Sequence, residues 1–362
     1  MFKIITDNAE PYGNLVRQFI QSEFPQPGCA SSADVVDLIT NEIFGTKNSR
    51  FGPKPSPESQ VAIRDVIRHY VAQSLPIPFL VPWGSEKPDG SGVDIAELGA
   101  LKIMNCLYHR IQQHYTPGAH FNIRLEDVSA PHLFNENQEQ ARINAEHYSA
   151  GFVNLIRVLE LDKFITPRRE SSIVSEAVFN ETADKLLPIM EQYVRAIASG
   201  DVTLIAIAQD AVKVIGWSGV VSQQTLDFYL GQYAKLYPNK DRNGRLHILA
   251  RYYSGALARH KLSIRGDSKE WNGKYLGFSF VPPIPGTDNH FTKMVYYRTL
   301  PMNLTSNHMP PWRCKGYLEI DDSNTVTPKL ARFDEQKDYV RAGLQLTNGD
   351  LLMDLNADYV LV

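Results

Sequence analysis

The order of secondary-structure signals between residues 77 and 125 constrains the fold of this chain most. The proline-bounded apolar run Ile77–Pro82 predicts a short strand, and a Gly-rich loop follows it. A helix is expected after Asp94, because Asp94 and Glu97 have the spacing of a capping box. Its apolar side chains form one stripe at helical spacing, made of Leu98, Leu101, Met104, Leu107 and Ile111. The alternating segment Ala119–Leu125 then predicts a second strand.

The same alternation of strands and helices continues to about residue 260, after which strand signals dominate. Helical patterns are expected at residues 60–73, 141–161, 181–199, 222–236 and 244–260, whereas 202–208 fits a strand or a helix. Later strands are expected at residues 261–265, 274–281, 293–299, 315–320, 339–346 and 351–355. We therefore expect an α/β fold whose helix-rich N-terminal and central part is Rossmann-like, with a strand-rich C-terminal part.

This pattern also suggests a division of the chain. Residues 1–59 are expected to form an N-terminal helical or linker segment, and residues 60–260 an α/β core. Residues 261–362 are expected to form the strand-rich C-terminal part that completes the active site.

Composition narrows the class of protein. The chain has 362 residues, of which 43% are hydrophobic and 21% charged, as in ordinary globular proteins. Its formal net charge of −3 argues against a nucleic-acid coat protein, but not against an enzyme with one basic groove. The 3 cysteines are too few for a disulfide framework, and no apolar run reaches the ~18 residues of a membrane span. We expect a cytoplasmic protein without membrane contact.

The first candidate site is the Gly-rich loop from Trp83 to Asp94, which carries Lys87 and leads into a helix. Free backbone N–H groups and the helix dipole favour an anion at such a helix start, and a lysine adds a positive charge. A surface turn with a structural capping box explains the same residues. Asp94 and Glu97 are accordingly either helix caps or catalytic carboxylates. Asp127, which follows the second strand, either binds an amine or is a solvent-exposed residue at the strand end.

Two further segments carry cations beside polar or aromatic residues. Ser263 and Arg265 alternate with apolar residues in the segment 261–265, and Trp312 precedes Arg313 after two prolines. A tryptophan supplies a stacking face and an arginine a bidentate donor to anions, although each arginine could equally form a surface salt bridge. The histidines are scattered, so no metal site and no cofactor are expected.

Taken in order, several of these segments resemble the isonitrile (isocyanide) synthase family, which includes pyoverdine- and dityrosine-type biosynthesis enzymes. The resemblance covers roughly residues 60 to 320 and rests on the order of the motifs. These are the proline-bounded strand, the loop lysine, the acidic helix start, the turn Tyr115–Ala119, a Tyr-led helix from Tyr148, the segment 261–265, and Pro311–Arg313. At Arg265 and Arg313 the family pattern has histidine.

The resemblance implies a reaction between the amine of an α-amino acid and the ketone of ribulose 5-phosphate, without a cofactor. The residues it implies as catalytic are Lys87, Asp94, Glu97 and Asp127. Those it implies as substrate-binding are Tyr115, Ser263, Arg265, Trp312 and Arg313. Unlike histidine, arginine keeps its proton near neutral pH, and it binds anions. Arginine at positions 265 and 313 therefore favours the step that joins the amine to the electrophile over the later steps, which need proton transfer.

Two other functions remain open at this point. The first is a phage-type amino acid:DNA transferase acting on a pyrophosphorylated hypermodified thymine. Its leaving group is an anion, which the two arginines could bind. Its candidate nucleic-acid contacts are Lys47, Arg50, Lys54, Arg242 and Arg245. The second is a non-catalytic binding paralogue. The expected partners are therefore a free α-amino acid and either a phosphorylated sugar or a pyrophosphorylated DNA base, and the oligomeric state is left open.

Overall fold

The computed structural model of the chain describes residues 3–6, 34–45, 56–85, 87, 90–129, 138–216, 221–262, 274–280, 293–296, 310–331, 338–340 and 343–362. Of the candidate residues, Lys47, Arg50, Lys54, Ser263 and Arg265 lie outside these ranges. No helix within the ranges is long and apolar enough to cross a membrane.

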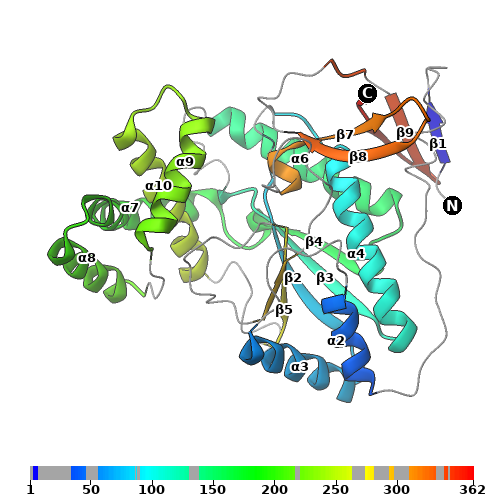
Figure 1. Cartoon of the computed structure of the whole chain (residues 1–362), viewed down its shortest axis with the longest axis horizontal. Coiled ribbons are helices and arrows are strands. Elements are labelled where there is room, and N and C mark those ends of the chain that lie inside the picture. Colours follow the sequence, from blue (N-terminus) through cyan, green and yellow to red (C-terminus); the bar gives the residue numbers. More distant parts are fainter. Residues whose placement is uncertain are drawn as a thin grey trace.

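A five-stranded parallel sheet forms the centre of the molecule (Figure 1). In spatial order its strands are β4 (Ile165–Arg169), β3 (Ala119–Leu125), β2 (Ile77–Trp83), β5 (Leu276–Ser279) and β6 (Met294–Tyr296). Counted along the chain, this is the order 3-2-1-4-5 of a Rossmann sheet, which confirms the expected fold class. The order reverses between β2 and β5, so the carboxyl ends of these two strands flank the position where such folds bind ligands.

One face of this sheet, called here the apolar face, is covered by helices. Alternate strand residues such as Phe79, Phe121 and Phe278 form one aromatic cluster there, with ring centroids 5.0–6.0 Å apart. The helices are α2 (Val35–Gly45), α3 (Pro57–Ala72), α4 (Ile95–His114) and α6 (Gln138–Val158). All five residues of the stripe predicted for α4, Leu98 to Ile111, are buried in this cluster, so the helical period was predicted correctly.

Between β4 and β5 the chain builds a separate helical lobe, seen at the left of Figure 1. It consists of α7 (Glu176–Ser199), α8 (Val202–Val214), α9 (Gln223–Leu236) and α10 (Arg242–Lys261), which share their own hydrophobic core. The ambiguous segment 202–208 belongs to α8, because the Asp201 side chain accepts hydrogen bonds from the N–H groups of Thr203 and Leu204 at 2.8 and 3.1 Å. This N-cap selects a helix where apolar periodicity alone could not decide.

The expected strand at residues 261–265 is wrong at its start. Lys261 is the final residue of α10 and Leu262 is its C-cap, so the helix continues past the predicted end at residue 260. The rest of that segment lies outside the described residues. The basic residues Arg259, His260 and Lys261 suit a helix C-terminus, since cations there interact favourably with the helix dipole.

The C-terminal part, together with the N-terminal strand β1, forms two small sheets that pack against α4 and α6. One has the order β1-β9-β10 and the other the order β11-β7-β8. Their strands are β1 (Lys3–Thr6), β7 (Lys315–Ile320), β8 (Val326–Ala331), β9 (Gly343–Asn348), β10 (Leu351–Asn356) and β11 (Tyr359–Leu361). Strand β7 meets the N-terminus of α4, where the N–H group of Gly316 donates to the Asp94 carboxylate at 3.2 Å.

The contact between β7 and α4 requires a glycine at position 316. A Cβ atom there would lie 2.1 Å from the backbone nitrogen of Ala96 and 2.8 Å from the carbonyl carbon of Ile95. These are backbone atoms of a capped helix end and cannot move aside cheaply. We predict that Gly316→Ala lowers the free energy of unfolding by about 2 kcal/mol, measured by urea denaturation.

The matched control is Gly231→Ala in α9, where an added Cβ meets no atom within 4 Å. Alanine favours a helix over glycine by about 0.5–1 kcal/mol, so this variant should be as stable as the wild type or more stable. Equal unfolding free energies for the two variants would contradict the tight contact at position 316.

Candidate functional site

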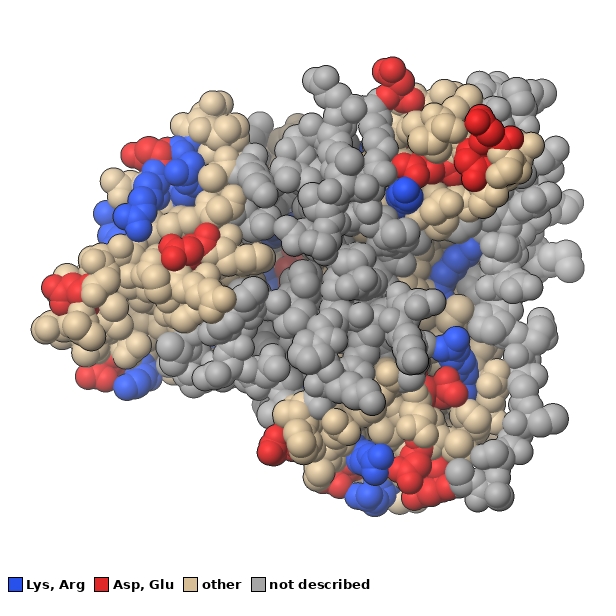
Figure 2. All heavy atoms as spheres, viewed as in Figure 1, with Lys and Arg blue, Asp and Glu red and all other residues tan. Residues whose placement is uncertain are grey.

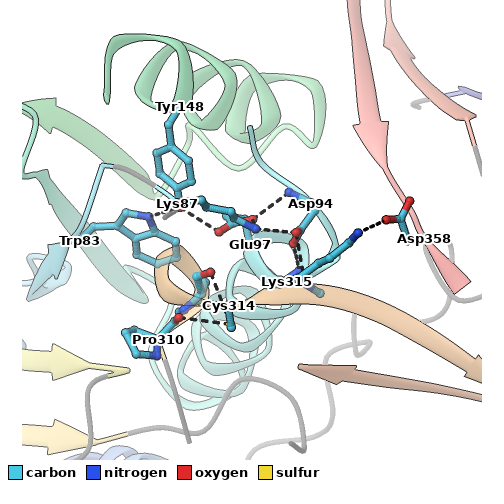
Figure 3. Close-up of polar contacts among 12 residues, drawn as sticks. Trp83, Lys87, Asp94, Glu97, Tyr148, Pro310, Cys314, Lys315 and Asp358 are labelled. Carbon is cyan, nitrogen blue, oxygen red and sulfur yellow. Dashed lines mark hydrogen bonds and ion pairs between the residues drawn. The ribbon is translucent and has the colours of Figure 1, made fainter. Parts of the chain in front are cut away.

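Three charged side chains meet at the carboxyl end of β2, beside the point where the strand order reverses. The Nζ atom of Lys87 lies 2.6 Å from Oδ2 of Asp94 and 2.9 Å from Oε2 of Glu97. Figure 3 shows the lysine side chain directed at the two carboxylates. All three residues are buried, and Lys87 and Glu97 are 0% exposed. The structure therefore brings together three of the four residues implied as catalytic.

The local sequence explains why the carboxylates lie here. Asp94 is the N-cap of α4 and accepts from the N–H group of Ala96 at 2.7 Å, while its own N–H group donates to Oε2 of Glu97 at 2.8 Å. The capping box that the sequence predicted is confirmed. The caps and the candidate carboxylates are the same residues, so the structural and the chemical interpretation do not exclude each other.

The second oxygen of Glu97 is bound from the helix α6. The Tyr148 hydroxyl donates to Oε1 of Glu97 at 2.9 Å, and Nε1 of Trp83 donates to the tyrosine oxygen at 3.0 Å. The only sign of these contacts in the sequence is a tyrosine within an apolar helical stripe, because a buried tyrosine hydroxyl needs a polar partner. The contacts connect β2, α4 and α6 through polar atoms.

Burial and mutual charge set the protonation of this cluster. Burial would lower the pKa of Lys87, but Asp94 and Glu97 more than offset it, so the pKa of the lysine lies above its ordinary value. Burial raises the pKa of Glu97 to about 8, against the opposing pull of Lys87. Burial also raises the pKa of the neighbouring Cys314, whose thiol donates to the carbonyl oxygen of Pro310 at 3.3 Å. Lys87 is accordingly a cation at neutral pH, and Glu97 can take up or release a proton there.

The expectation of a phosphate at the start of α4 needs correction. The carboxylate of Asp94 already accepts the N–H bonds of Ala96 and Gly316, and Lys87 is paired with two carboxylates. The protein's own anions thus occupy the position that a bound phosphate would take. The cluster is better suited to proton transfer than to anion binding.

Asp127, the fourth residue implied as catalytic, has a structural partner. Its two carboxylate oxygens accept from the backbone N–H and the hydroxyl of Ser171 at 3.1 and 2.6 Å, which holds the turn after β4. Next to it lies a cluster that the sequence did not predict, in which Arg259 of α10 pairs with Glu126 and Glu170. These ion pairs join the helical lobe to the carboxyl ends of β3 and β4.

Of the residues implied as substrate-binding, the structure describes Trp312, Arg313 and Tyr115. Trp312 is buried with its ring centroid 5.0 Å from that of Trp83, and it packs so closely on Gly84 that an added Cβ would lie 2.2 Å from its ring. Arg313 follows it in the turn η2 (Pro311–Arg313), near Tyr233 of the helical lobe. Burial raises the pKa of Tyr233, and the charge of Arg313 opposes this rise.

Tyr115 is not part of the site. Its hydroxyl donates to the carbonyl oxygens of Tyr70 and Leu75 at 3.1 and 2.9 Å, beside the amino end of β2. The 20 residues of α4 separate it from Asp94, a distance of about 30 Å along the helix axis. The Tyr115 hydroxyl thus has structural partners at the opposite edge of the sheet, and the implied substrate contact stays a prediction.

The two described basic candidates for a nucleic-acid contact lie at the start of α10. Arg242 donates to the carbonyl oxygen of Ala198 at 3.3 Å, and Arg245 donates to that of Lys240 at 2.9 Å. Figure 2 shows lysine and arginine side chains gathered over α9 and α10, with acidic side chains close by. This placement does not test the nucleic-acid contact, which stays a prediction.

Metal ligation was also considered. In the part of the chain that the structure describes, no group of three or more His, Cys, Asp or Glu side chains could hold a metal ion.

Comparison with known proteins supports the fold and little else. No protein-family model matches the sequence, and no curated protein matches it. Among solved structures, the crystal structure of the PvcA protein from Pseudomonas aeruginosa is similar, with a TM-score of 0.53. The match covers 91% of this chain and 100% of PvcA at 13% sequence identity, so it shows a shared fold and only a remote resemblance.

Removal of the buried cation should destabilise the protein strongly. Lys87→Met leaves the buried Asp94 carboxylate without its counter-charge, which typically costs about 3–5 kcal/mol. We predict a loss of this size in the free energy of unfolding, measured by urea denaturation at pH 7. The exposed Lys185→Met, which breaks a surface pair with Glu181, should change it by less than about 0.5 kcal/mol. Similar losses in both variants would refute the buried ion pair.

The raised pKa of Glu97 predicts a pH-dependent stability. The folded protein holds the Glu97 proton up to about pH 8, whereas the unfolded chain releases it near the ordinary glutamate pKa of 4.5. The free energy of unfolding should therefore fall as the pH rises within this window, by roughly 2 kcal/mol between pH 6 and pH 8. Glu97→Gln should flatten this slope, while the exposed Glu181→Gln should leave it unchanged. An identical slope in Glu97→Gln and wild type would show that Glu97 does not titrate in this range.

Proposed function

We propose that this chain is an amino-acid-dependent enzyme, similar to the isonitrile synthases, that joins the amine of an α-amino acid to a phosphorylated electrophile. In the family that the motif order resembles, this electrophile is ribulose 5-phosphate. The proposal concerns the formation of the bond between nitrogen and carbon, and not the later steps that yield an isonitrile.

The observation that carries the proposal is the buried Lys87–Asp94–Glu97 cluster at the carboxyl end of β2. Buried charged groups with shifted pKa values are costly for stability, and they concentrate at functional sites. The cluster lies beside the reversal of strand order, where open α/β sheets bind their ligands. The motif order, which includes these three residues, and the fold likeness to PvcA are consistent with the same assignment.

The chemistry of the joining step fits the protonation of the cluster. An α-amino acid arrives mainly as an ammonium ion and must lose a proton before its nitrogen can attack. Burial raises the pKa of Glu97 to about 8, which is much closer to that of an amine than an ordinary carboxylate is, so proton transfer from the ammonium ion to Glu97 is less unfavourable than to an ordinary carboxylate. In this proposal the amine binds at the Lys87 end of the cluster, and Lys87 relays the proton to Glu97.

The bond changes depend on the electrophile. With a ketone, the nitrogen lone pair attacks the carbonyl carbon, and the resulting carbinolamine loses water to give an imine. With a pyrophosphorylated base, the new carbon–nitrogen bond replaces a carbon–oxygen bond, and pyrophosphate leaves with its negative charge. Neither route needs an oxidant or a reductant, and both release the amine proton to a base.

Mass spectrometry can separate these reactions. The full-length protein is incubated with a pool of α-amino acids and either ribulose 5-phosphate or DNA that carries a pyrophosphorylated hypermodified thymine. A product with the mass of amino acid plus ribulose 5-phosphate minus water supports the proposed function. An amino acid attached to DNA supports the transferase instead. Product from neither mixture contradicts both reactions and leaves the non-catalytic paralogue.

Glu97→Gln tests the role of the cluster in turnover. The amide keeps an oxygen for the N–H group of Asp94 and an NH2 group toward Tyr148, but it cannot accept a proton. We predict that kcat falls by about 10²–10⁴-fold, the usual contribution of a general base, while the circular dichroism spectrum stays unchanged. The control Glu181→Gln, on the surface of α7, should retain wild-type kcat. Wild-type turnover by a folded Glu97→Gln variant would remove Glu97 from the mechanism.

A further inference from the structure

Two buried hydrogen bonds in series reach Glu97 from the helix α6, and they can run in one direction only. The Nε1–H group of Trp83 donates to the Tyr148 hydroxyl oxygen at 3.0 Å, and the Tyr148 hydroxyl donates to Oε1 of Glu97 at 2.9 Å. Figure 3 shows the Tyr148 side chain extending from α6 to this carboxylate. An indole N–H group donates and cannot accept, so the single hydroxyl proton of Tyr148 is directed at Glu97.

Tyr148 keeps this proton at neutral pH. The residue is fully buried, and burial raises the pKa of its hydroxyl well above the ordinary value. The negative charge of Glu97 raises the pKa further, because a tyrosinate would lie beside a carboxylate. The hydroxyl of Tyr148 is therefore a constant donor to Glu97.

The two oxygens of Glu97 have different partners. Oε1 accepts from Tyr148, whereas Oε2 accepts from the N–H group of Asp94 at 2.8 Å and lies 2.9 Å from Nζ of Lys87. Donors on both oxygens hold the carboxyl group against rotation about its terminal bond. Oε2 is accordingly the oxygen that faces the lysine.

The titratable groups that face Glu97 come from several elements. Lys87 belongs to the loop after β2, Asp94 to the start of α4, Tyr148 to α6, and Cys314 lies between η2 and β7. Burial raises the pKa of Glu97, the charge of Lys87 lowers it, and the charge of Asp94 raises it. Cys314 and Tyr148 are neutral, because burial raises the pKa of each. Removal of the tyrosine hydroxyl thus takes away a donor and leaves every charge around Glu97 in place.

We propose that Tyr148 is a positioning residue, which holds Oε1 of Glu97 and thereby keeps Oε2 turned toward Lys87 for proton transfer. Proton transfer requires that donor and acceptor lie within hydrogen-bond reach. The contact between Lys87 and Oε2, at 2.9 Å, meets this requirement only in the orientation that Tyr148 fixes. The use of this orientation in turnover rests on the proposed function, whereas the effect of Tyr148 on the Glu97 proton does not.

The same hydrogen bond sets how tightly Glu97 holds its proton. A bond donated to a carboxylate stabilises the charged form and so lowers the pKa of the group. Without the hydroxyl of Tyr148, the pKa of Glu97 should rise beyond its value of about 8. A larger share of Glu97 would then already be protonated at neutral pH and unable to accept a proton from the amine.

Infrared titration of the full-length protein tests the proposal without turnover. The band of the protonated Glu97 carboxyl group is identified as the band that Glu97→Gln lacks, and its intensity is followed as the pH rises. We expect a midpoint near pH 8 in the wild type. In Tyr148→Phe the midpoint should lie about one pH unit higher, which is a tenfold higher proton affinity.

The matched control is Tyr193→Phe in the helical lobe. This change also removes a buried tyrosine hydroxyl, one that accepts from the N–H group of Val221 at 3.0 Å. It should destabilise the protein without moving the midpoint of the Glu97 band. An unchanged midpoint in a folded Tyr148→Phe variant, or an equal shift in Tyr193→Phe, would overturn the proposal.

Trp83→Phe decides the case if Tyr148→Phe does not fold. The variant keeps the bond from Tyr148 to Glu97 and removes the N–H group that donates to the tyrosine oxygen. Hydrogen bonds in series strengthen one another, so the bond to Glu97 should weaken and its proton affinity should rise by about twofold. A midpoint that does not rise in Trp83→Phe would then overturn the proposal.

Turnover separates the failure of this role from the failure of the proposed function. In an active protein, the pH profile of kcat/KM should shift in Tyr148→Phe together with the infrared midpoint. A shifted midpoint in a protein that forms no product refutes the proposed function and keeps the effect of Tyr148 on Glu97. Product formation with the same midpoint and pH profile in wild type and Tyr148→Phe refutes the positioning role and keeps the function.

Discussion

The buried pairing of Lys87 with Asp94 and Glu97 is the interaction on which the rest of the structure depends. An ammonium and two carboxylates can be taken out of water together only if their remaining hydrogen-bonding atoms are also satisfied. The chain meets this requirement from three elements. The N–H groups of α4 and β7 bind Asp94, and the hydroxyl of Tyr148 on α6 binds Glu97. Each of these elements is therefore fixed relative to the end of β2 by a polar contact as well as by packing.

The strand order explains the position of this cluster. In a Rossmann sheet the order reverses between the first and fourth strands, here β2 and β5, and such folds bind ligands outside the carboxyl ends of the strands at that point. In a doubly wound fold, the crossover after β4 would pack a helix on the second face. Here that crossover forms the helical lobe, which contacts the sheet edge through Arg259.

Local signals in the sequence predicted the elements but not their contacts. The capping box located the start of α4, and the apolar stripe predicted its buried side, because both depend on residues within a few positions of one another. The bond from Gly316 to Asp94 joins residues 222 positions apart and has no local signature. Tyr115 was assigned to the site from the order of the motifs along the chain. That order does not give distances in space, and the whole length of α4 separates Tyr115 from the Lys87 cluster.

The Asp94–Gly316 bond also has a consequence for the order in which the protein is made. Gly316 belongs to β7, and β7 is held in turn by β11, through the pairing of Leu318 with Tyr359. A ribosome adds about 5–20 residues per second, so roughly tens of seconds pass between the synthesis of Asp94 and that of Tyr359. During this time the nascent chain holds Lys87 and its carboxylates with one side still open to water. The charge cluster closes only when translation reaches β11, and premature termination before that strand leaves an incomplete site.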